Sequence, residues 1–459
     1  MPAVFLSVAS GCKSPDPESV ARPLTGIPDT FLSSPTLPED PVIYDGWVHH
    51  LEDPTLESFL ASGLAENFDL RIALARLDAS AARFGIAASA SNPSLNLSSG
   101  AARQRTNLET PAGLVSDTAN RFDVVANVSW EIDLWGRLRA SSAAARADFE
   151  ASELDYQAAL LSFSKNLVES WYGVVSNRIQ SQIVSETLES LNQTLEIVEG
   201  RYQRGLTTSL DVRSSRSEVA AAGALQVSTF NEGKVLERRL QTLAGIFDSP
   251  LPTLPEVLPR LPPLPSPGVA SKLLEQRPDL QAASFRLEAA ARRVESAEKA
   301  RLPNLQLTAD LGRAAQSLED LGNADFSVWG IAGRALLPIT QGGLLKARVA
   351  ESEALLRAEA ETYRSLALQA FTEVEIALLS DREIGNQLTF LEQAVVEGVA
   401  AQTLALEQYE RGITNITTVL STQRRTLDAK RNLAAAQFAF LQNRLNFYLA
   451  LGAYPQSRL

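Results

Sequence analysis

The chain repeats itself, and the repeat is clearest in two short stretches, RYQRGLTTSLDV at 201–212 and QYERGITNITTV at 408–419. The tyrosines, arginines and glycines of the two stretches align at a constant offset of 207 residues (409 − 202). Gly205 and Gly412 each follow a long proline-free run and precede Thr or Asn residues. This order is typical of a helix that ends at a glycine and is followed by the N-cap of a returning helix. The sequence therefore predicts two helical hairpins with their tips at these glycines.

The duplication extends over most of the chain. The segment FDLRIALARLDASAARFG at 68–85 aligns with PDLQAASFRLEAAARRVE at 278–295 at an offset of 210, whereas Gly136 aligns with Gly343 at 207. A difference of three residues is of the size that surface loops readily tolerate. Each half is expected to run helix, strand, loop, strand, helix, turn, helix.

Prolines divide the chain into helical runs and connections. They cluster before residue 60 and between 250 and 278, whereas 112–249 and 339–454 contain none. Since proline breaks helix interiors, the run 137–204 is predicted to be one helix of 68 residues (204 − 137 + 1), about 100 Å long at 1.5 Å per residue. Shorter helices at about 62–90 and 207–246 can stack end to end beside it. This pattern favours a wall of helices over a bundle with a single core.

The predicted strands alternate between apolar and polar residues. In FDVVANVSWEIDLW at 122–135, the even positions from Phe122 to Leu134 are apolar, and most of the odd positions are polar. SLNLSSGA and NLQLTADLG repeat this pattern with leucines on one side, and FSVWGIAGRALLPI continues it through Ile339 with Arg334 on the polar side. Neither half has an apolar run long enough for a membrane helix, so any membrane-embedded part is expected to be β-structure. Four strands cannot close a barrel and lipid does not tolerate open edges, so several chains are expected to share one.

Composition and residue usage exclude several functions. A net charge of −12 argues against a nucleic-acid partner, because such binding is driven by neutralising phosphates. The two histidines, His49 and His50, are adjacent and lack any accompanying catalytic or metal-binding motif. No enzyme activity, cofactor or metal is expected. A structural coiled-coil or adhesin-like surface protein is the main alternative, although it would not account for the four alternating strands.

Cys12 is the only cysteine. It follows MPAVFLSVASG, a short apolar stretch that ends in small residues, as the last part of a signal peptide does. The segment resembles a bacterial lipobox, in which Cys12 would become the lipidated (palmitoylated) first residue of the mature protein. The alternative is an incidental cysteine in a tail.

Taken together, these segments resemble the TolC-type outer-membrane efflux channels, specifically the lipoprotein branch of tripartite efflux systems. The resemblance covers about residues 40–455, and its most specific pieces are SWEIDLWGRLRAS (129–141), EQRPDLQAASFRLEAA (275–290), ARLPNLQLTADLG (300–312), LPITQGG (337–343) and QYERGITNITTVLSTQRRTLDAKRNLAAAQ (408–437). It implies a mainly α-helical trimer in which each chain adds four strands to a shared twelve-stranded membrane β-barrel. A long periplasmic α-helical barrel, built from the two tandem repeats, continues from it.

The resemblance also implies the organisation and the partners. The expected parts are a signal remnant, lipidated leader and start of the equatorial region (1–60), a first repeat (61–246), a proline-rich linker (247–270), a second repeat (271–450) and a C-terminal tail (451–459). The expected function is the exit channel of an efflux pump, in the outer membrane of a Gram-negative bacterium and extending into the periplasm. A homotrimer, outer-membrane lipid, a periplasmic adaptor and an inner-membrane transporter are the implied partners.

In this family the hairpin tips form the periplasmic gate. Relatives of the lipoprotein branch often have an aspartate where this chain has Ser421, so a carboxylate ring would have to come from Asp211 on the facing helix. The turn residues and the exposed tips would meet the adaptor, although packing at helix ends explains the tyrosines and arginines equally well. The expected gate residues are Tyr202, Asp211, Tyr409, Thr418, Ser421 and Arg424, and the expected turn and docking residues are Arg204, Gly205, Arg411 and Gly412.

Overall fold

The structure is a computed structural model that describes residues 31, 46–111, 113–247, 249–264 and 275–455. Cys12 lies outside the described residues, so its predicted lipidation stays a prediction. The described chain divides into two compact units. The first comprises Arg76–Glu153 and Ala282–Ser365, and the second comprises the rest.

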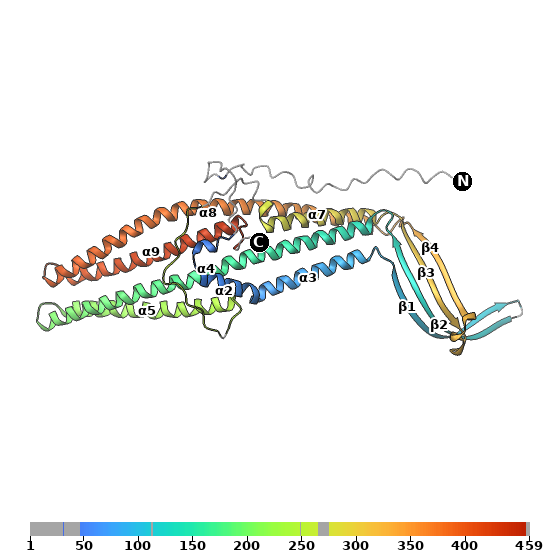
Figure 1. Ribbon diagram of the computed structural model, residues 1–459, viewed down its shortest axis with the longest axis horizontal. Coiled ribbons are helices and arrows are strands. Elements are labelled where there is room, and N and C mark those ends of the chain that lie inside the picture. The colour runs from blue at the N-terminus through green and yellow to red at the C-terminus, as the bar shows by residue number, and fades with distance from the viewer. Residues whose placement is uncertain (1–30, 32–45, 112, 248, 265–274, 456–459) are drawn as a thin grey trace. The chain divides into compact units, whose positions relative to one another are not determined.

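The first unit contains a four-stranded antiparallel sheet in the order β1-β2-β3-β4. Its strands are β1 (Ser94–Thr110), β2 (Gly113–Ile132), β3 (Asn304–Ala315) and β4 (Ser327–Leu336), and two 3-10 turns, η2 (Glu319–Gly322) and η3 (Ala324–Phe326), connect β3 to β4 (Figure 1). The prediction of four strands, two from each half, is confirmed. The fourth strand ends at Leu336, before the Ile339 predicted to continue it, because Pro338 cannot donate to a strand ladder.

The register places the apolar and polar positions on opposite faces of the sheet. One row across the first, apolar face runs from strand to strand through Leu97, Ala126, Leu311 and Trp329. The second, the polar face, carries Asn127 and Asp310, and Arg334 lies on it as predicted. The apolar face is exposed in the single chain: the side chains of Leu97, Trp329 and Ile331 are each about three-quarters exposed (76%, 74% and 77%).

The same unit also contains a small alanine-rich core. It is formed by α7 (Pro278–Lys299) and α8 (Leu344–Glu410), through Leu287, Ala290, Ala291, Val294, Leu356 and Ala360. Alanines at these positions let the two helix backbones approach closely. Arg293 of α7 also forms an ion pair with Asp148 of α4 (Arg137–Gln203).

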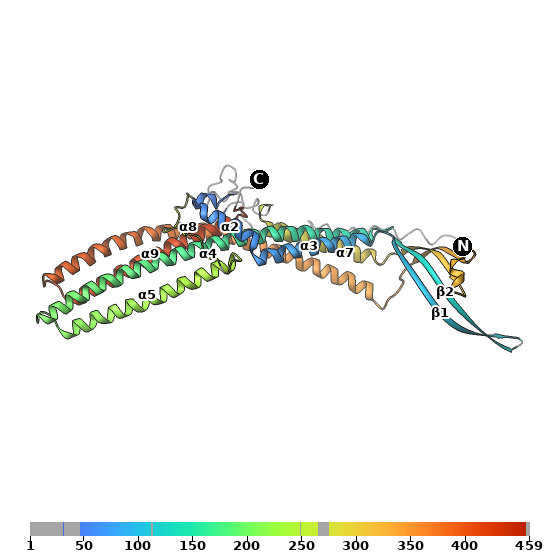
Figure 2. The same ribbon diagram turned by 60° about the horizontal axis from the view of Figure 1, so that its bottom comes forward.

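The second unit contains the greater part of two long helical hairpins. One consists of α4 and α5 (Ser209–Leu243), and the other of α8 and α9 (Ile416–Ala450); their members run side by side in Figures 1 and 2. The helix predicted at 137–204 is confirmed as α4, which has 67 residues. Among the described residues, no helix combines the length and the apolarity needed to cross a membrane.

The helix predicted at about 62–90 is instead two helices, α2 (Pro54–Glu66) and α3 (Phe68–Ser89). The break occurs at Asn67, whose side chain accepts a hydrogen bond from the Leu70 N–H at 2.9 Å. An asparagine that caps a new helix in this way competes with continuation of the old one. The short 3-10 helix η1 (His49–Leu51) precedes α2.

An aromatic and aliphatic core surrounds α2 in the second unit. Asp53 caps α2 through the Leu56 N–H, and its Oδ2 accepts hydrogen bonds from the Trp171 indole at 3.1 Å and from the Tyr172 hydroxyl at 3.4 Å. Burial, together with the negative charge of Asp53, raises the pKa of Tyr172. The Tyr172 hydroxyl therefore stays protonated and donates to Asp53, which links α4 to the start of α2.

The second helix of each hairpin is followed by a glycine with a positive φ. Gly245 and Gly452, which follow α5 and α9, have φ of +75° and +71°. A Cβ on Gly245 would lie 2.8 Å from the carbonyl oxygen of Glu66, and one on Gly452 would lie 3.1 Å from that of Gln276. Both positions require glycine for its backbone conformation and for the space available.

Candidate functional site

The tip of the first hairpin is a glycine turn followed by a capping box. The N–H of Gly205 (φ +71°) donates to the Tyr202 carbonyl at 2.9 Å, and the N–H of Leu206 donates to the Arg201 carbonyl at 2.9 Å. These bonds close the C-terminus of α4. Thr208 then caps α5, and the Asp211 carboxylate bonds back to the Thr208 N–H.

The Asp211 carboxylate forms its hydrogen bonds within this turn. Its Oδ2 accepts hydrogen bonds from the Thr207 hydroxyl (2.6 Å), the Thr208 N–H (2.9 Å) and the Thr208 hydroxyl (2.8 Å). The Thr207 hydroxyl, followed by the Thr208 N–H, lowers the pKa of Asp211 against the opposing effect of burial. The carboxylate is thus ionised at neutral pH and already has three donors.

The second tip has the same turn but a different cap. The N–H of Gly412 (φ +75°) donates to the Tyr409 carbonyl at 2.9 Å. Asn415 caps α9 by accepting hydrogen bonds from the Thr418 N–H and the Thr418 hydroxyl, both at 3.0 Å. Thr418 occupies the position equivalent to Asp211 (211 + 207), so this tip has no titrating group in its cap.

The two tip tyrosines differ in burial. Tyr202 is 49% exposed, whereas Tyr409 is 3% exposed. The guanidinium of Arg201 lies 4.8 Å from the centre of the Tyr409 ring, and its Nη1 donates to the Glu410 carbonyl at 3.0 Å. Arg201 therefore joins the end of α4 to the end of α8. Within the described residues, the Tyr409 hydroxyl has no hydrogen-bond partner.

Arg424 makes a second link between the hairpins. It forms an ion pair with Glu218, which joins α9 to α5, and the arginine side chain is 62% exposed. By contrast, Arg216 of α5 binds Glu199 of α4 at 2.7 Å, within one hairpin. Ser421 makes no such link, because its hydroxyl donates to the Thr418 carbonyl of its own helix at 2.9 Å. Arg204 and Arg411 are exposed at the turns.

An apolar cluster and a polar cluster lie beneath these links. Val198, Val212, Tyr409, Ile416 and Val419 pack together from all four helices. Next to them the buried Gln423 amide of α9 donates to the Ser190 hydroxyl at 3.1 Å and to the Thr194 hydroxyl at 2.9 Å, both on α4. Buried polar groups of this kind fix one register between helices.

The structure thus brings Tyr409, Arg424 and Asp211 to the tips but reveals partners that the sequence analysis missed. Those partners are Arg201, Glu218 and Gln423. A signal for one was present: Glu218 aligns with Arg425 at the offset of 207, so the repeats carry opposite charges there. A contact between the two hairpins can require different residues at equivalent positions of the repeats. In the sequence, its only signal is therefore a position at which the two aligned repeats differ.

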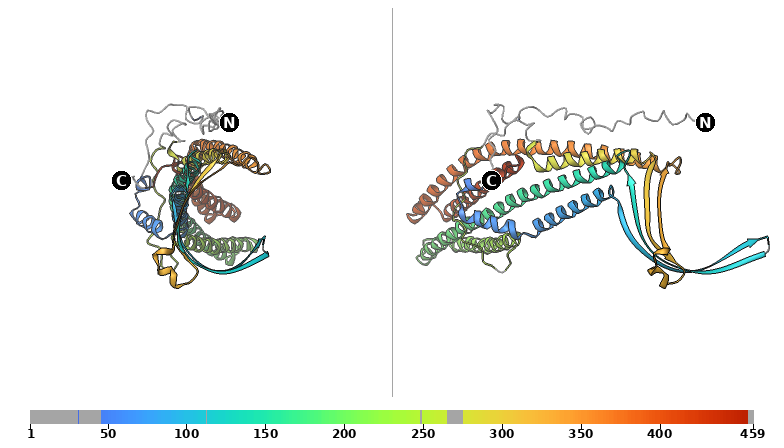
Figure 3. Two further views of the ribbon diagram at one scale, coloured as in Figure 1. Left: turned by 90° about the vertical axis from the view of Figure 1, so that its right-hand side faces the viewer. Right: turned by 45° about the vertical axis from the view of Figure 1, so that its right-hand side comes forward.

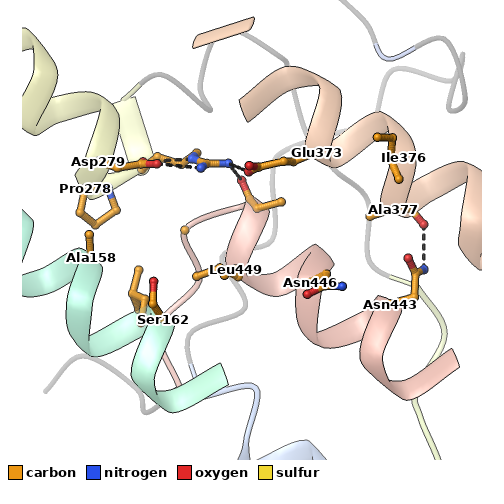
Figure 4. A pocket seen from close by; sticks show the side chains of 14 residues that line it. Ala158, Ser162, Pro278, Asp279, Glu373, Ile376, Ala377, Asn443, Asn446 and Leu449 are labelled. Carbon is orange, nitrogen blue, oxygen red and sulfur yellow. Dashed lines mark hydrogen bonds and ion pairs between the residues drawn. The ribbon is translucent and has the colours of Figure 1, made fainter. Parts of the chain in front are cut away.

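A cavity of about 460 Å³ lies at the other end of the second hairpin, in the second unit. The Arg277 side chain in its wall binds Asp279 and Glu373, both at 2.7 Å, and the Ala450 carbonyl at 3.1 Å (Figure 4). Burial opposes the charge of Arg277, but Asp279 and then Glu373 raise its pKa. Because these polar groups already bind one another, we assign the cavity wall a structural role: it fastens α7 to α8 and α9. The described residues contain no group of side chains suited to hold a metal ion.

The comparisons with known proteins agree with the fold. The family model for outer membrane efflux proteins matches residues 60–245 and 269–453. The pyoverdine export outer membrane protein OpmQ of Pseudomonas putida is 30% identical over 449 residues, covering 96% of this chain and 94% of that protein. The toluene efflux pump outer membrane protein TtgF of the same species is 29% identical over 401 residues, covering 87% and 82%.

The solved structure of the outer-membrane channel OprN superimposes with a TM-score of 0.82 at 26% identity, covering 94% of this chain and 98% of that one. That of the MtrE outer membrane channel of Neisseria gonorrhoeae gives a TM-score of 0.83 at 23% identity, covering 95% and 97%, and so supports the fold alone. The resemblance to outer-membrane efflux channels is confirmed, and the family and these relatives are channel proteins of efflux systems rather than enzymes. The chain belongs to the outer membrane efflux protein family.

Proposed function

We propose that three copies of this chain form the exit duct of a tripartite efflux pump, which passively conducts substrates delivered by an inner-membrane transporter and a periplasmic adaptor. The observation that carries the proposal is the two-faced sheet. Its exposed apolar face suits lipid and its polar face suits water. Among the described residues, β1 and β4 each have one edge without a partner strand. Free edges are not tolerated in lipid, so each must pair with another copy.

The number of copies follows from pore size. Two chains would supply eight strands, and a barrel of that size is filled by its own side chains. Three chains supply twelve strands and leave a channel. Purified protein in detergent should therefore have the mass of three protomers and should conduct ions across a planar bilayer. A stable, non-conducting monomer would refute the proposal.

We place the gate of the duct at the hairpin tips. Two contacts link the hairpins: the guanidinium of Arg201 over the Tyr409 ring, and the ion pair of Arg424 with Glu218. The ion pair is at the surface, whereas Tyr409 is buried. The exposed ion pair exchanges for water or for adaptor contacts at a cost of at most about 1 kcal/mol, whereas separating Arg201 from the buried Tyr409 ring costs more. Opening then requires loss of the ion pair and separation of the Arg201–Tyr409 contact. Tyr202, Arg204 and Arg411 remain exposed at the turns and are available to an adaptor.

Asp211, Thr418 and Ser421 have a different role in this proposal. Each uses its side chain within its own helix or cap. They set the geometry of the turns around Gly205 and Gly412. The links between hairpins come from the arginines.

Cys12 is proposed as the site of lipid attachment. One acyl chain adds little to the anchoring of an inserted barrel, so trimer formation should not depend on it. Mass spectrometry of the mature N-terminus should find a lipidated Cys12. An unmodified residue upstream of Cys12 at the mature N-terminus would overturn this assignment.

The exported substrate class is proposed by similarity. The relatives named for pyoverdine and toluene export have comparable identities to this chain, 30% over 449 residues and 29% over 401 residues. Ducts of one family thus serve chemically different molecules, and we propose that the duct itself does not select among them. We therefore assign substrate selection to the transporter and the adaptor. A strain that carries this duct as its only exit channel should then export both a siderophore and a solvent, and export of only one of them would contradict the assignment.

A further inference from the structure

The first two strands continue beyond the rest of the sheet. β1 and β2 pair as far as Thr110 and Gly113, whereas the pairing of β2 with β3 stops at Phe122 and Ala315. Residues 102–110 and 113–121 therefore form a two-stranded ribbon past the edge of the four-stranded part, on the side away from the helices (Figure 3). The ribbon is exposed along almost its whole length.

Two arginines lie on the apolar side of this ribbon, just beyond the apolar row at which the four-stranded part of the sheet ends. That row contains Ala101 opposite Phe122. Arg103, opposite Asn120, is the next residue of β1 on the same face, and Arg105, opposite Thr118, is the one after it. At about 3.3 Å per residue they lie roughly 7 and 13 Å past the apolar row.

Neither arginine forms an ion pair with another described residue, and both are exposed. On the polar face of the same ribbon, Arg121 bonds to Asp123 at 3.2 Å. The nearest carboxylate on the arginine side of the ribbon is Glu109, four residues beyond Arg105. The acidic residues Glu319, Asp320 and Asp325 belong to the β3–β4 connection, whose η2 contacts β2, and among the described residues none of them forms an ion pair with Arg103 or Arg105.

We propose that Arg103 and Arg105 bind the phosphate groups of the lipid in the outer leaflet of the outer membrane. The inference rests on the proposed placement of the apolar face in the lipid. A guanidinium binds phosphate with two parallel hydrogen bonds, and a position immediately past an apolar belt is at the depth of lipid headgroups. Three copies would place six such arginines around the duct, in contact with the phosphorylated glycolipid of that leaflet.

The test uses full-length protein purified from outer membranes in mild detergent, with bound lipid A counted by native mass spectrometry. The variant R103Q/R105Q should retain at most a third of the lipid A that the wild type retains. The matched control R121Q changes an arginine of the same ribbon on the opposite face and should retain the wild-type amount. R103K/R105K keeps the charge but loses the paired hydrogen bonds and should be intermediate.

A second measurement needs no variant. Wild-type protein is reconstituted in phosphatidylcholine vesicles that contain either lipid A or enzymatically dephosphorylated lipid A, and lipid A retained after re-solubilisation is counted. We expect at least threefold more of the phosphorylated form. Equal retention, or an R103Q/R105Q variant that matches R121Q, overturns the inference. Failure of the wild type to insert as a conducting trimer would instead refute the proposed function.

Discussion

Gly245, at the end of the first hairpin away from its tip, is required both for its backbone conformation and for the space around it. Gly205, at the tip, is required for its backbone conformation alone. Gly245 has a positive φ, and its Cβ position is 2.8 Å from the Glu66 carbonyl oxygen. Gly205 has a positive φ but open space around it. The left-handed conformation costs a non-glycine residue about 1–2 kcal/mol, and a clash in a packed region adds about 1–3 kcal/mol.

Gly245→Ala should therefore lower the unfolding temperature more than Gly205→Ala does. Thermal unfolding followed by circular dichroism in detergent measures the difference, and Gly205→Ala is the matched control for backbone strain alone. If the two variants unfold at the same temperature, the clash with Glu66 relaxes without cost.

Asp211 predicts a pH response at one tip only. Its pKa is lowered in the folded state, so its cap contributes fully above the ordinary carboxyl value of about 4 and is lost as the pH falls through the lower folded value. Hydrogen exchange at the start of α5, corrected for intrinsic rates, should accelerate through this acidic range, since loss of a cap costs about 1 kcal/mol.

The start of α9 supplies the internal control for this response. Asn415 and Thr418 cap α9 without a titrating group. Exchange there should stay constant over the same range, and Asp211→Asn should abolish the response of α5. Equal acceleration at both helix starts would show that acid loosens the tips by another route.

Among the elements, the links between hairpins are proposed to hold the gate. Replacing Arg424 and Tyr409 together by Ala removes the pair with Glu218 and the ring beneath Arg201, and should raise single-channel conductance in planar bilayers. The exposed ion pair contributes at most about 1 kcal/mol, and truncating a buried aromatic costs about 3–5 kcal/mol, so Tyr409 should dominate.

Two matched controls accompany this variant. Arg216→Ala breaks an ion pair inside one hairpin and should leave conductance unchanged. Tyr409→Phe keeps the ring and removes a hydroxyl that has no partner among the described residues, so it too should behave as wild type. If the double variant conducts and exports as wild type does, the closure lies elsewhere in the duct.

The helices and strands were largely predictable because their signals are local. Proline-free runs marked α4, and alternation marked β2 and the face on which Leu97 and Trp329 lie. The break at Asn67 was missed because capping competes with a helical pattern that continues through it. The difference between Tyr202 and Tyr409 could not be predicted either, since the repeats are alike at these positions and only the packing of one hairpin on the other separates them.

At the scale of the whole molecule, the question is how the free edges of β1 and β4 are satisfied. The sheet has four strands with an exposed apolar face, and neither outer strand has a second partner strand among the described residues. A closed ring of three copies would pair every β1 with the β4 of a neighbour, and no edge would remain.

Cysteine cross-linking tests this ring, because Cys12 is the only native cysteine and Cys12→Ser gives a clean background. One cysteine is fixed at Ala332 of β4, and a second is moved along the same face of β1 through Asn96, Ser98 and Ala102. Disulfides require Cα atoms within about 7 Å, so oxidation of intact membranes should link copies efficiently at one β1 position and weakly at the others. The linked product should stop at three protomers, because a closed ring leaves no free edge for a fourth. Monomers at every position, or ladders longer than three, would contradict a three-copy ring.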